Sequence, residues 1–327
     1  MKTIFGKSRG TLAGVSILLA ISLAQCGCTS GENGADRRTP AGDLGRSDLV
    51  AAGGPVRVVA TYSILGDWVR TVGGDRIELT VLVGPEGDAH TYEPTPRDSV
   101  SLAEADVIFE NGLGFEVWLD RLFEASGSKA KRVVVTERIE PRELAVSASR
   151  TEIDPHVWHL PENAMVMVEA VTSALERADP DGMSGYRDRH AAYVGQLQEL
   201  DAWISRQTAS IPEDRRKLVT THDTFGYLAD RYGFEVLSVL GSVSSESSDP
   251  SARQVAEIID RIRELKIPAV FAENILNPRL TRTIAAGAGV QIVPTLYTDA
   301  LGPADSPGGD YLGMMRFNVK TIAEALR

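Results

Sequence analysis

Short apolar runs alternate with amphipathic segments along most of the chain. The apolar runs predict strands at 56–62, 76–84, 106–110, 132–136, 217–221, 234–240, 269–273 and 290–296. Segments with helical periodicity lie between and after them, at 64–72, 96–105, 115–125, 161–178, 225–232, 250–266, 278–286 and 309–327. Because strands alternate with helices of about ten residues, the pattern indicates an α/β fold with parallel sheets that are covered by helices on both faces.

One longer helical segment interrupts this alternation. Residues 184–210 contain no proline, and their apolar positions recur at helical spacing with charged residues between them. At about 1.5 Å per residue such a helix is roughly 40 Å long, enough to cross a whole lobe. We therefore expect two α/β lobes joined by one long rigid helix. The predicted boundaries are 56–183 for the N-terminal lobe, 184–211 for the connecting helix and 212–327 for the C-terminal lobe.

The first residues have the pattern of an export signal. Three basic residues precede an apolar run at 11–24, which is shorter than the roughly 20 residues of a membrane-spanning helix. The run ends in the residues LAQC, which resemble the bacterial lipobox. We expect residues 1–25 to be a lipoprotein-type signal peptide and Cys26 to be lipidated, with Cys28 as the alternative. Residues 26–55 have the composition of a flexible tether.

Cysteine content and charge narrow the chemistry of the body. The only two cysteines, Cys26 and Cys28, precede it, so it has no disulfide and no thiolate metal ligand. The formal net charge is −11, and removal of the three basic residues in the signal leaves −14. An acidic chain of this kind is a poor partner for nucleic acid. We expect an exported protein on the periplasmic or cell-surface face of a bacterial membrane, with inner or outer membrane left open.

Four residues of metal-binding type lie near the ends of predicted elements. His90, His222 and Asp299 lie at or just past strand ends, and His156 precedes a helix. In open α/β sheets, ligands bind outside the carboxyl ends of the strands. Three imidazoles and one carboxylate make a closed tetrahedral set for a divalent cation, and imidazole favours Zn, Cu, Fe or Ni over Mg and Ca. We therefore predict that these four residues bind one metal ion.

Other polar residues near these segments are less specific. His159 either lies behind the ligands or is exposed, and His190 is expected on the surface. Several acids either orient a ligand imidazole by accepting its second N–H or cap a helix. These acids are Asp88, Glu93, Asp223 and Glu273.

Four ordered segments resemble the metal-specific solute-binding proteins of ABC importers, the zinc and manganese branch also called cluster A-I. The segments are HTYEPTP at 90–96, DPHVW at 154–158, TTHDTFGY at 220–227 and YTDAL at 297–301. The resemblance covers the whole body from about residue 56. It implies an interlobe cleft, to which the N-terminal lobe contributes His90 and His156 and the C-terminal lobe contributes His222 and Asp299. It also implies a lipid-anchored, monomeric, high-affinity receptor that hands its metal ion to the transmembrane subunits of a permease.

The choice of metal depends mainly on the third ligand. Family members assigned to manganese often carry Glu where this chain has His222, and members assigned to zinc often carry a His-rich loop that this chain lacks. The nitrogen-rich set favours Zn(II) by affinity order, with Mn(II) or Fe(II) as the alternatives.

Two other functions have weaker support. A zinc hydrolase needs an open coordination position and a general base, whereas four protein ligands leave no such position. No H-E-x-x-H pattern occurs in the sequence, so we expect no enzymatic activity. Cell adhesion, a label given to some lipoproteins of this family, is a secondary alternative, because the sequence shows no separate adhesion module.

Overall fold

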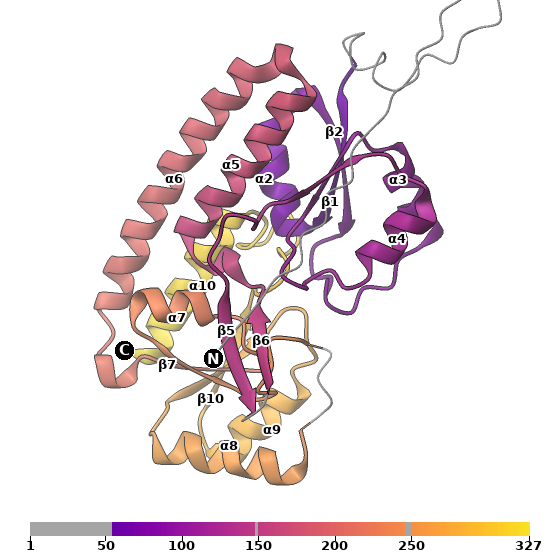
Figure 1. Ribbon diagram of the computed structural model, residues 1–327. Helices are drawn as coiled ribbons and strands as arrows, with labels where there is room; N and C mark the ends of the chain where they lie inside the picture. Colours follow the sequence, from indigo (N-terminus) through magenta and orange to yellow (C-terminus); the bar gives the residue numbers. More distant parts are fainter. Residues whose placement is uncertain (1–53, 148–149, 246–249) are drawn as a thin grey trace, which may run out of the picture. The chain divides into compact units, whose positions relative to one another are not determined.

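The part of the chain described by the computed structural model is an α/β fold (Figure 1). It comprises residues 54–147, 150–245 and 250–327. The predicted signal peptide, both cysteines and nearly all of the predicted tether lie outside the described residues. Among the helices that are described, none combines the length and apolar character needed to cross a membrane.

The first four strands form one parallel sheet. β1 (Val56–Tyr62) pairs on one side with β2 (Ile77–Val83) and on the other with β3 (Val107–Glu110), and β4 (Lys131–Val134) extends the sheet beyond β3. The order is therefore β2-β1-β3-β4. β1 is buried along almost its whole length and β3 along all of it, as expected for central strands that helices cover on both faces.

Helices make the crossovers that parallel pairing requires. They are α2 (Ser63–Gly73), α3 (Pro96–Glu104) and α4 (Leu119–Ser126). The start of α3 also anchors the loop that follows β2. Asp98 Oδ2 accepts hydrogen bonds from the backbone N–H and the hydroxyl of Thr95, at 2.6 and 2.8 Å, and from the Tyr92 hydroxyl at 2.8 Å. This loop carries His90, so the cap of α3 limits where His90 can lie.

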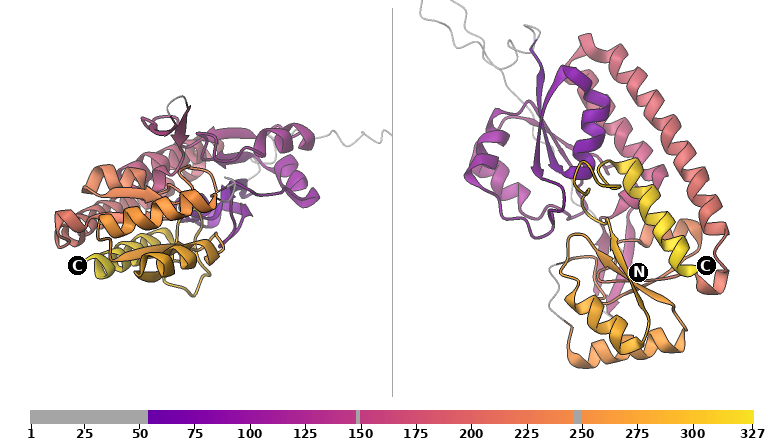
Figure 2. Two further views of the ribbon diagram at one scale, coloured as in Figure 1. Left: turned by 90° about the horizontal axis from the view of Figure 1, so that it is seen from below. Right: turned by 180° about the vertical axis from the view of Figure 1, so that it is seen from behind.

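The segment predicted to form one long helix does so. α6 (Met183–Ala209) has 27 residues and packs against α5 (Pro161–Ala178) and α2. Its buried side chains recur at helical spacing, as Tyr186, Tyr193, Leu197, Leu200 and Ile204 show. The C-terminal helix α10 (Tyr311–Leu326) lies beside α6 and also contacts α2, as the rear view in Figure 2 shows.

The strand–helix alternation resumes after α6, as predicted. β7 (Lys217–Thr220) pairs in parallel with β8 (Glu235–Ser238), and β9 (Ala269–Glu273) pairs in parallel with β10 (Gln291–Leu296). β7 also lies next to β9. The helices of this part are α7 (Gly226–Tyr232), α8 (Ala252–Glu264) and α9 (Arg279–Ala288).

An antiparallel hairpin lies where no element is predicted from the sequence. It consists of β5 (Arg142–Ser147) and β6 (Arg150–Asp154). The Tyr227 hydroxyl of α7 holds its base, because it donates to the Asp154 carbonyl at 3.0 Å and accepts from the Arg142 backbone N–H at 2.8 Å. Both strands are rich in charged residues, so their apolar pattern is weak and a distant contact stabilises the pairing.

The hydrophobic core is shared between the two predicted lobes. One cluster contains buried residues from both, among them Phe109, Leu200, Phe271 and Met314. A smaller cluster lies between β7, β9, α8 and α9. The lobe boundaries at 183 and 211 stay a prediction.

Candidate metal centre

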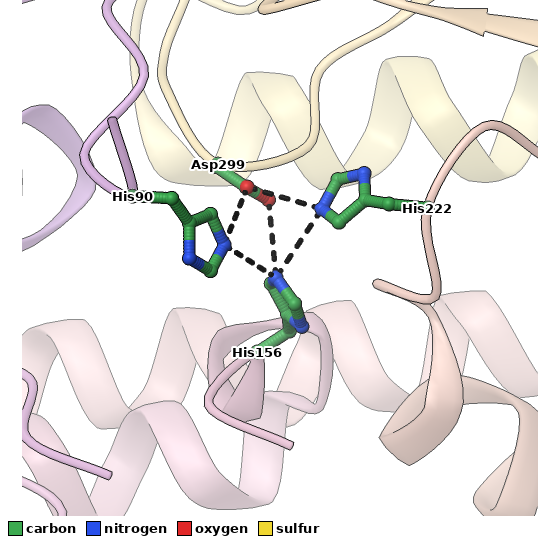
Figure 3. Close-up of side chains that lie close together, drawn as sticks. All are labelled: His90, His156, His222 and Asp299. Atoms are coloured by element: carbon green, nitrogen blue, oxygen red, sulfur yellow. Dashed lines mark hydrogen bonds and ion pairs between the residues drawn. The ribbon is translucent and has the colours of Figure 1, made fainter. Parts of the chain in front are cut away.

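The four predicted ligand residues converge on one buried point (Figure 3). His90 follows β2, His156 follows β6, His222 follows β7 and Asp299 follows β10. His156, His222 and Asp299 have no solvent exposure, and His90 is 6% exposed. One donor atom from each residue lies within 4.8 Å of the other three. Segments spread over more than 200 residues of sequence (His90 to Asp299) therefore meet in one place.

Four of the distances between these atoms match the edges of a tetrahedral metal site. His156 Nε2 lies 3.2 Å from His90 Nε2 and 3.3 Å from His222 Nε2. Asp299 Oδ2 lies 3.1 Å from His222 Nε2 and 3.3 Å from His90 Nε2. When metal–ligand bonds are about 2.0–2.1 Å, the edges of a tetrahedron are about 3.3–3.4 Å. The four atoms thus enclose a space suited to a four-coordinate ion of the size of Zn(II).

Contacts between the imidazoles favour a cation at the centre. Each neutral imidazole has one N–H and one lone pair, so three Nε2 atoms that face one another cannot all be satisfied by mutual hydrogen bonds. A divalent cation accepts a lone pair from all three and attracts the carboxylate. A divalent cation at the centre therefore satisfies all four donor atoms at once.

Asp154 orients His156 for this role. Its Oδ1 lies 2.8 Å from His156 Nδ1 and accepts the His156 backbone N–H at 3.0 Å. Its other oxygen lies 3.2 Å from Arg142 Nη1. Donation of Nδ1–H to Asp154 leaves the Nε2 lone pair free to bind metal. Asp154 is missing from the acids predicted to orient an imidazole; the signal that points to it is its position two residues before His156.

Glu273 supports His222 from the neighbouring strand. Glu273 Oε2 lies 2.5 Å from His222 Nδ1, a close contact that is not aligned as a hydrogen bond. Its Oε1 accepts the backbone N–H groups of Thr221 and His222, at 2.5 and 3.1 Å. Because β9 lies next to β7, the last residue of β9 reaches the end of β7. The sequence allowed Glu273 either to orient a candidate ligand imidazole or to cap a helix. In the structure it lies beside the His222 imidazole.

The other acids considered from the sequence do not contact a ligand ring in the described structure. Asp88 Oδ1 accepts the His90 backbone N–H at 2.9 Å, and its Oδ2 accepts from Ser245 Oγ at 2.7 Å. Asp223 lies 3.8 Å from the Arg142 guanidinium. Glu93 is exposed. Asp88 thus restrains the backbone of the His90 loop.

The two remaining histidines differ from each other in burial. His159 has no solvent exposure, which excludes the exposed position that the sequence allowed for it. The His190 side chain is 22% exposed and lies 3.1 Å from Glu169 Oε2. The prediction of a surface position for His190 is therefore only partly right, since the neighbouring helix α5 covers much of the side chain.

Carboxylates set the protonation of two ligand histidines. Burial by itself lowers the pKa of His156, but Asp299 and Asp154 outweigh it and raise the pKa to about 9. Burial likewise opposes the charge on His222, yet Glu273 and Asp299 raise its pKa well above the usual value. In the metal-free protein at neutral pH, these two sites therefore hold protons that a metal ion has to displace.

The other two candidate ligands have the protonation states that suit metal binding at neutral pH. Burial raises the pKa of Asp299, but the contacts with His222 and His156 outweigh it and hold the pKa well below the usual range. Burial lowers the pKa of His90, and the nearby Asp299 only partly opposes this. Asp299 is thus ionised and His90 neutral, which are the forms that bind a cation.

We expect Glu273→Gln to weaken metal binding by about 10- to 100-fold. The amide removes the negative charge beside His222 Nδ1, so the imidazole becomes a weaker donor and loses part of its orientation. Competition with a chromophoric chelator measures the affinity. Glu110→Gln is the matched control, because Glu110 is also a buried glutamate at a strand end but pairs with Arg132, 2.7 Å away. An equal loss in both variants would contradict a specific role for Glu273.

Comparison with known proteins places the chain in a family. Residues 58–325 match the family described as zinc-uptake complex component A, periplasmic. The manganese-binding lipoprotein MntA of Halalkalibacterium halodurans is 34% identical over 310 residues, which cover 95% of this chain and 97% of that protein. The iron-binding protein YfeA of Yersinia pestis is 32% identical over 268 residues, or 82% of this chain and 85% of YfeA.

A solved structure agrees with this match. The zinc-binding protein TroA of Treponema pallidum is 36% identical over 288 residues, or 86% of this chain and 92% of TroA. Its structure aligns with a TM-score of 0.78 at 34% identity, and the alignment covers 84% of this chain and 99% of the TroA chain. The chain belongs to the zinc-uptake component A family, whose members are solute-binding receptors of metal ABC transporters and not enzymes.

Proposed function

We propose that the protein captures Zn(II) outside the cytoplasmic membrane and delivers it to the permease of an ABC importer. In this proposal His90, His156, His222 and Asp299 are the four ligands of the transported ion. The observation that carries the proposal is the donor set, three imidazole nitrogens and one carboxylate oxygen, with four contacts of 3.1–3.3 Å that match edges of a tetrahedron.

The donor set supports zinc more strongly than the relatives do. The relatives are named for manganese, zinc and iron, so their names do not select one metal. Affinity for nitrogen-rich sites rises from Mn(II) through Fe(II) toward the later metals, and Zn(II) accepts tetrahedral geometry without loss, whereas Mn(II) suits octahedral oxygen-rich sites. A site with three imidazoles and four converging atoms therefore favours Zn(II), with Mn(II) or Fe(II) as the alternative cargo.

A pocket beside His90 supports a route for the ion. It has a volume of about 340 Å³ and is lined by His90, Leu113, Gly114, Val117, Glu152, Ile153, Pro155, Val243 and Ser244. His90 is also the only one of the four ligand residues with any exposure. We propose that the ion enters and leaves past His90. The loop that carries it and the segment after β8 are joined by the Ser245–Asp88 contact. We propose that small movements of these two segments open the site.

Membrane attachment is part of the same proposal. Relatives such as MntA are named lipoproteins, which supports lipidation at Cys26, or at Cys28 as the alternative. A lipid anchor with a tether at 26–55 keeps a monomeric receptor near the transmembrane subunits of its permease. The two lobes at 56–183 and 212–327, joined by α6, then move only slightly when the ion is released.

Competition between Zn(II) and Mn(II) tests the proposal directly. Metal-free protein is expected to bind one Zn(II) per chain and to prefer it over Mn(II) by at least about 100-fold, because imidazole donors favour the later metal. A chelator competition titration with each metal in the same buffer measures both affinities. Tighter binding of Mn(II) than of Zn(II) in the matched titrations would overturn the assignment of zinc. Absence of stoichiometric binding of either metal would overturn the receptor site itself.

A further inference from the structure

A further buried polar side chain, that of His159, lies directly behind the candidate metal site. His159 has no solvent exposure, and its Nε2 lies 3.2 Å from Thr224 Oγ1. Thr224 is also fully buried, and its hydroxyl donates to Asp299 Oδ1 at 3.2 Å. His159, Thr224 and Asp299 therefore form a continuous buried chain of two hydrogen bonds. It ends on the one carboxylate of the four-residue set.

The direction of each hydrogen bond follows from the number of available protons. A threonine hydroxyl has one hydrogen, and the ionised Asp299 can only accept, so Thr224 gives its hydrogen to Asp299. Thr224 Oγ1 then accepts from His159, which requires the Nε2–H tautomer of that imidazole. His159 Nδ1 has no hydrogen-bond partner among the described residues, as suits the ring nitrogen that carries no hydrogen. This tautomer is opposite to the Nδ1–H form of His156.

Aromatic packing holds His159 in this orientation. The ring centroid of Phe225 lies 4.4 Å from that of His159 at an interplanar angle of 40°, and the Trp158 ring lies 5.8 Å away. Phe225 follows Thr224 in the chain, and Trp158 precedes His159. The same short segments that place the two polar side chains therefore also pack against them. The donor chain is built into the fold and is not an exposed, mobile contact.

The two oxygens of Asp299 have different surroundings as a result. Oδ2 lies 3.1 Å from His222 Nε2 and 3.3 Å from His90 Nε2, within the tetrahedral set. Oδ1 accepts from Thr224 and lies 3.7 Å from His156 Nε2. A carboxylate oxygen that already accepts a hydrogen bond is a poorer metal donor. Thr224 thus favours binding through one oxygen only.

We propose that His159 and Thr224 are specificity-determining positioning residues, which hold Asp299 as a single-oxygen ligand and keep the site four-coordinate. A four-coordinate site with three imidazoles suits Zn(II), whereas a second carboxylate oxygen raises the coordination number toward that of Mn(II). This inference rests on the proposed function, because it concerns selection at the same site. An aspartate has two oxygens that can bind a metal ion. The proposed hydrogen-bond chain explains how only one oxygen of Asp299 is used.

Thr224→Val tests the inference with almost no change in side-chain volume. Removal of the hydroxyl frees Asp299 Oδ1 for the metal, so we expect the Zn(II)-to-Mn(II) affinity ratio to fall by about tenfold, the lower end of the effect of residues that orient metal ligands. We also expect Co(II)-loaded protein to lose intensity in its visible d–d bands, because four-coordinate Co(II) absorbs more strongly than five-coordinate Co(II). Thr224→Ser keeps the hydroxyl and should restore both properties.

Two further variants separate the hydrogen-bond chain from general packing. His159→Phe preserves an aromatic ring against Phe225 and removes the donor, so it should shift the ratio and the spectrum in the same direction as Thr224→Val. The double variant should show less than the sum of the two effects, as expected for residues in one chain. Thr172→Val is the control, because Thr172 is also a buried threonine, but it donates to the Val168 carbonyl within α5, at 2.8 Å.

The outcomes distinguish this inference from the proposed function. If the unaltered protein binds one Zn(II) and both Thr224→Val and His159→Phe keep its metal ratio and Co(II) spectrum, the positioning role is overturned and the receptor site stands. A shift in Thr172→Val as large as that in Thr224→Val would also overturn it. If the unaltered protein binds no Zn(II), the proposed function itself fails.

Discussion

Replacing His222 with alanine is expected to lower zinc affinity by about 100- to 1000-fold. Structural zinc sites bind with roughly 10–16 kcal/mol in total, so loss of one of four donors removes about 2.5–4 kcal/mol, at about 1.4 kcal/mol per factor of ten. His222 also lies between two acids, 2.5 Å from Glu273 Oε2 and 3.1 Å from Asp299 Oδ2. Its loss brings two buried carboxylates together without the imidazole that separates them, which disturbs the geometry of the remaining ligands.

Metal content after dialysis and a chelator competition titration measure this loss. His190→Ala is the matched control, since it removes a partly buried histidine that contacts Glu169 in the helical layer and no ligand of the site. The control should keep one Zn(II) per chain at the original affinity. Stoichiometric loading that His222→Ala leaves unchanged would show that the ion binds elsewhere.

Zinc affinity is expected to fall by about 10- to 100-fold for each pH unit between pH 8 and pH 6, or one factor of ten for each displaced proton. In the metal-free protein the pKa of His156 is raised to about 9, and that of His222 is raised well above its usual value. The pKa of His156 therefore lies above this pH window, and metal has to displace its proton throughout the window. The raised pKa of His222 favours a second proton that metal has to displace. The range reflects one or two protons, because the two Nε2 atoms are 3.3 Å apart and their charges oppose each other.

Metal-free stability should change with pH in the opposite sense. The pKa of His156 is about 9 in the folded chain, against about 6.5 when unfolded. Its protonation therefore stabilises the metal-free fold fully below about pH 6.5, and this contribution is lost as pH rises through about 9.

Zinc titrations at pH 6, 7 and 8 measure how the affinity depends on pH. Calorimetry in buffers of different ionisation heat counts the protons that are released when zinc binds. An affinity that stays constant from pH 6 to 8 would contradict protonated histidines in the metal-free site.

The competition between Zn(II) and Mn(II), the Glu273 variant and the Thr224 variant each test a different part of the same site. The metal preference depends on the donor atoms, Glu273→Gln on the support of one imidazole, and Thr224→Val on how the carboxylate binds. Because His222 connects Glu273 with Asp299, variants at these positions should not be additive. Double variants therefore need their own measurement.

Local patterns in the sequence were enough to predict most elements. Strands such as β1 and β9 are short and apolar, and the long helix α6 shows its periodicity over 27 residues. The four ligand-type residues could also be selected from the sequence, because three lie at strand ends, where parallel strands present ligands at one edge. Their four ordered segments carried the resemblance to metal receptors. The predictions of strands and helices succeed because each depends on neighbours within a few positions.

Contacts between distant segments decided the features that local patterns in the sequence did not predict. The β5–β6 hairpin has a weak apolar pattern, and Tyr227, more than 70 residues after its second strand, holds it in place. The same distance hides the chain from His159 to Asp299, whose links join residues 65 and 75 positions apart. By itself the sequence determined the fold class, the alternation of elements and the four candidate ligands. Only the tertiary structure decided which acids support them and which oxygen of Asp299 accepts from Thr224, because packing sets those contacts and local periodicity carries no record of them.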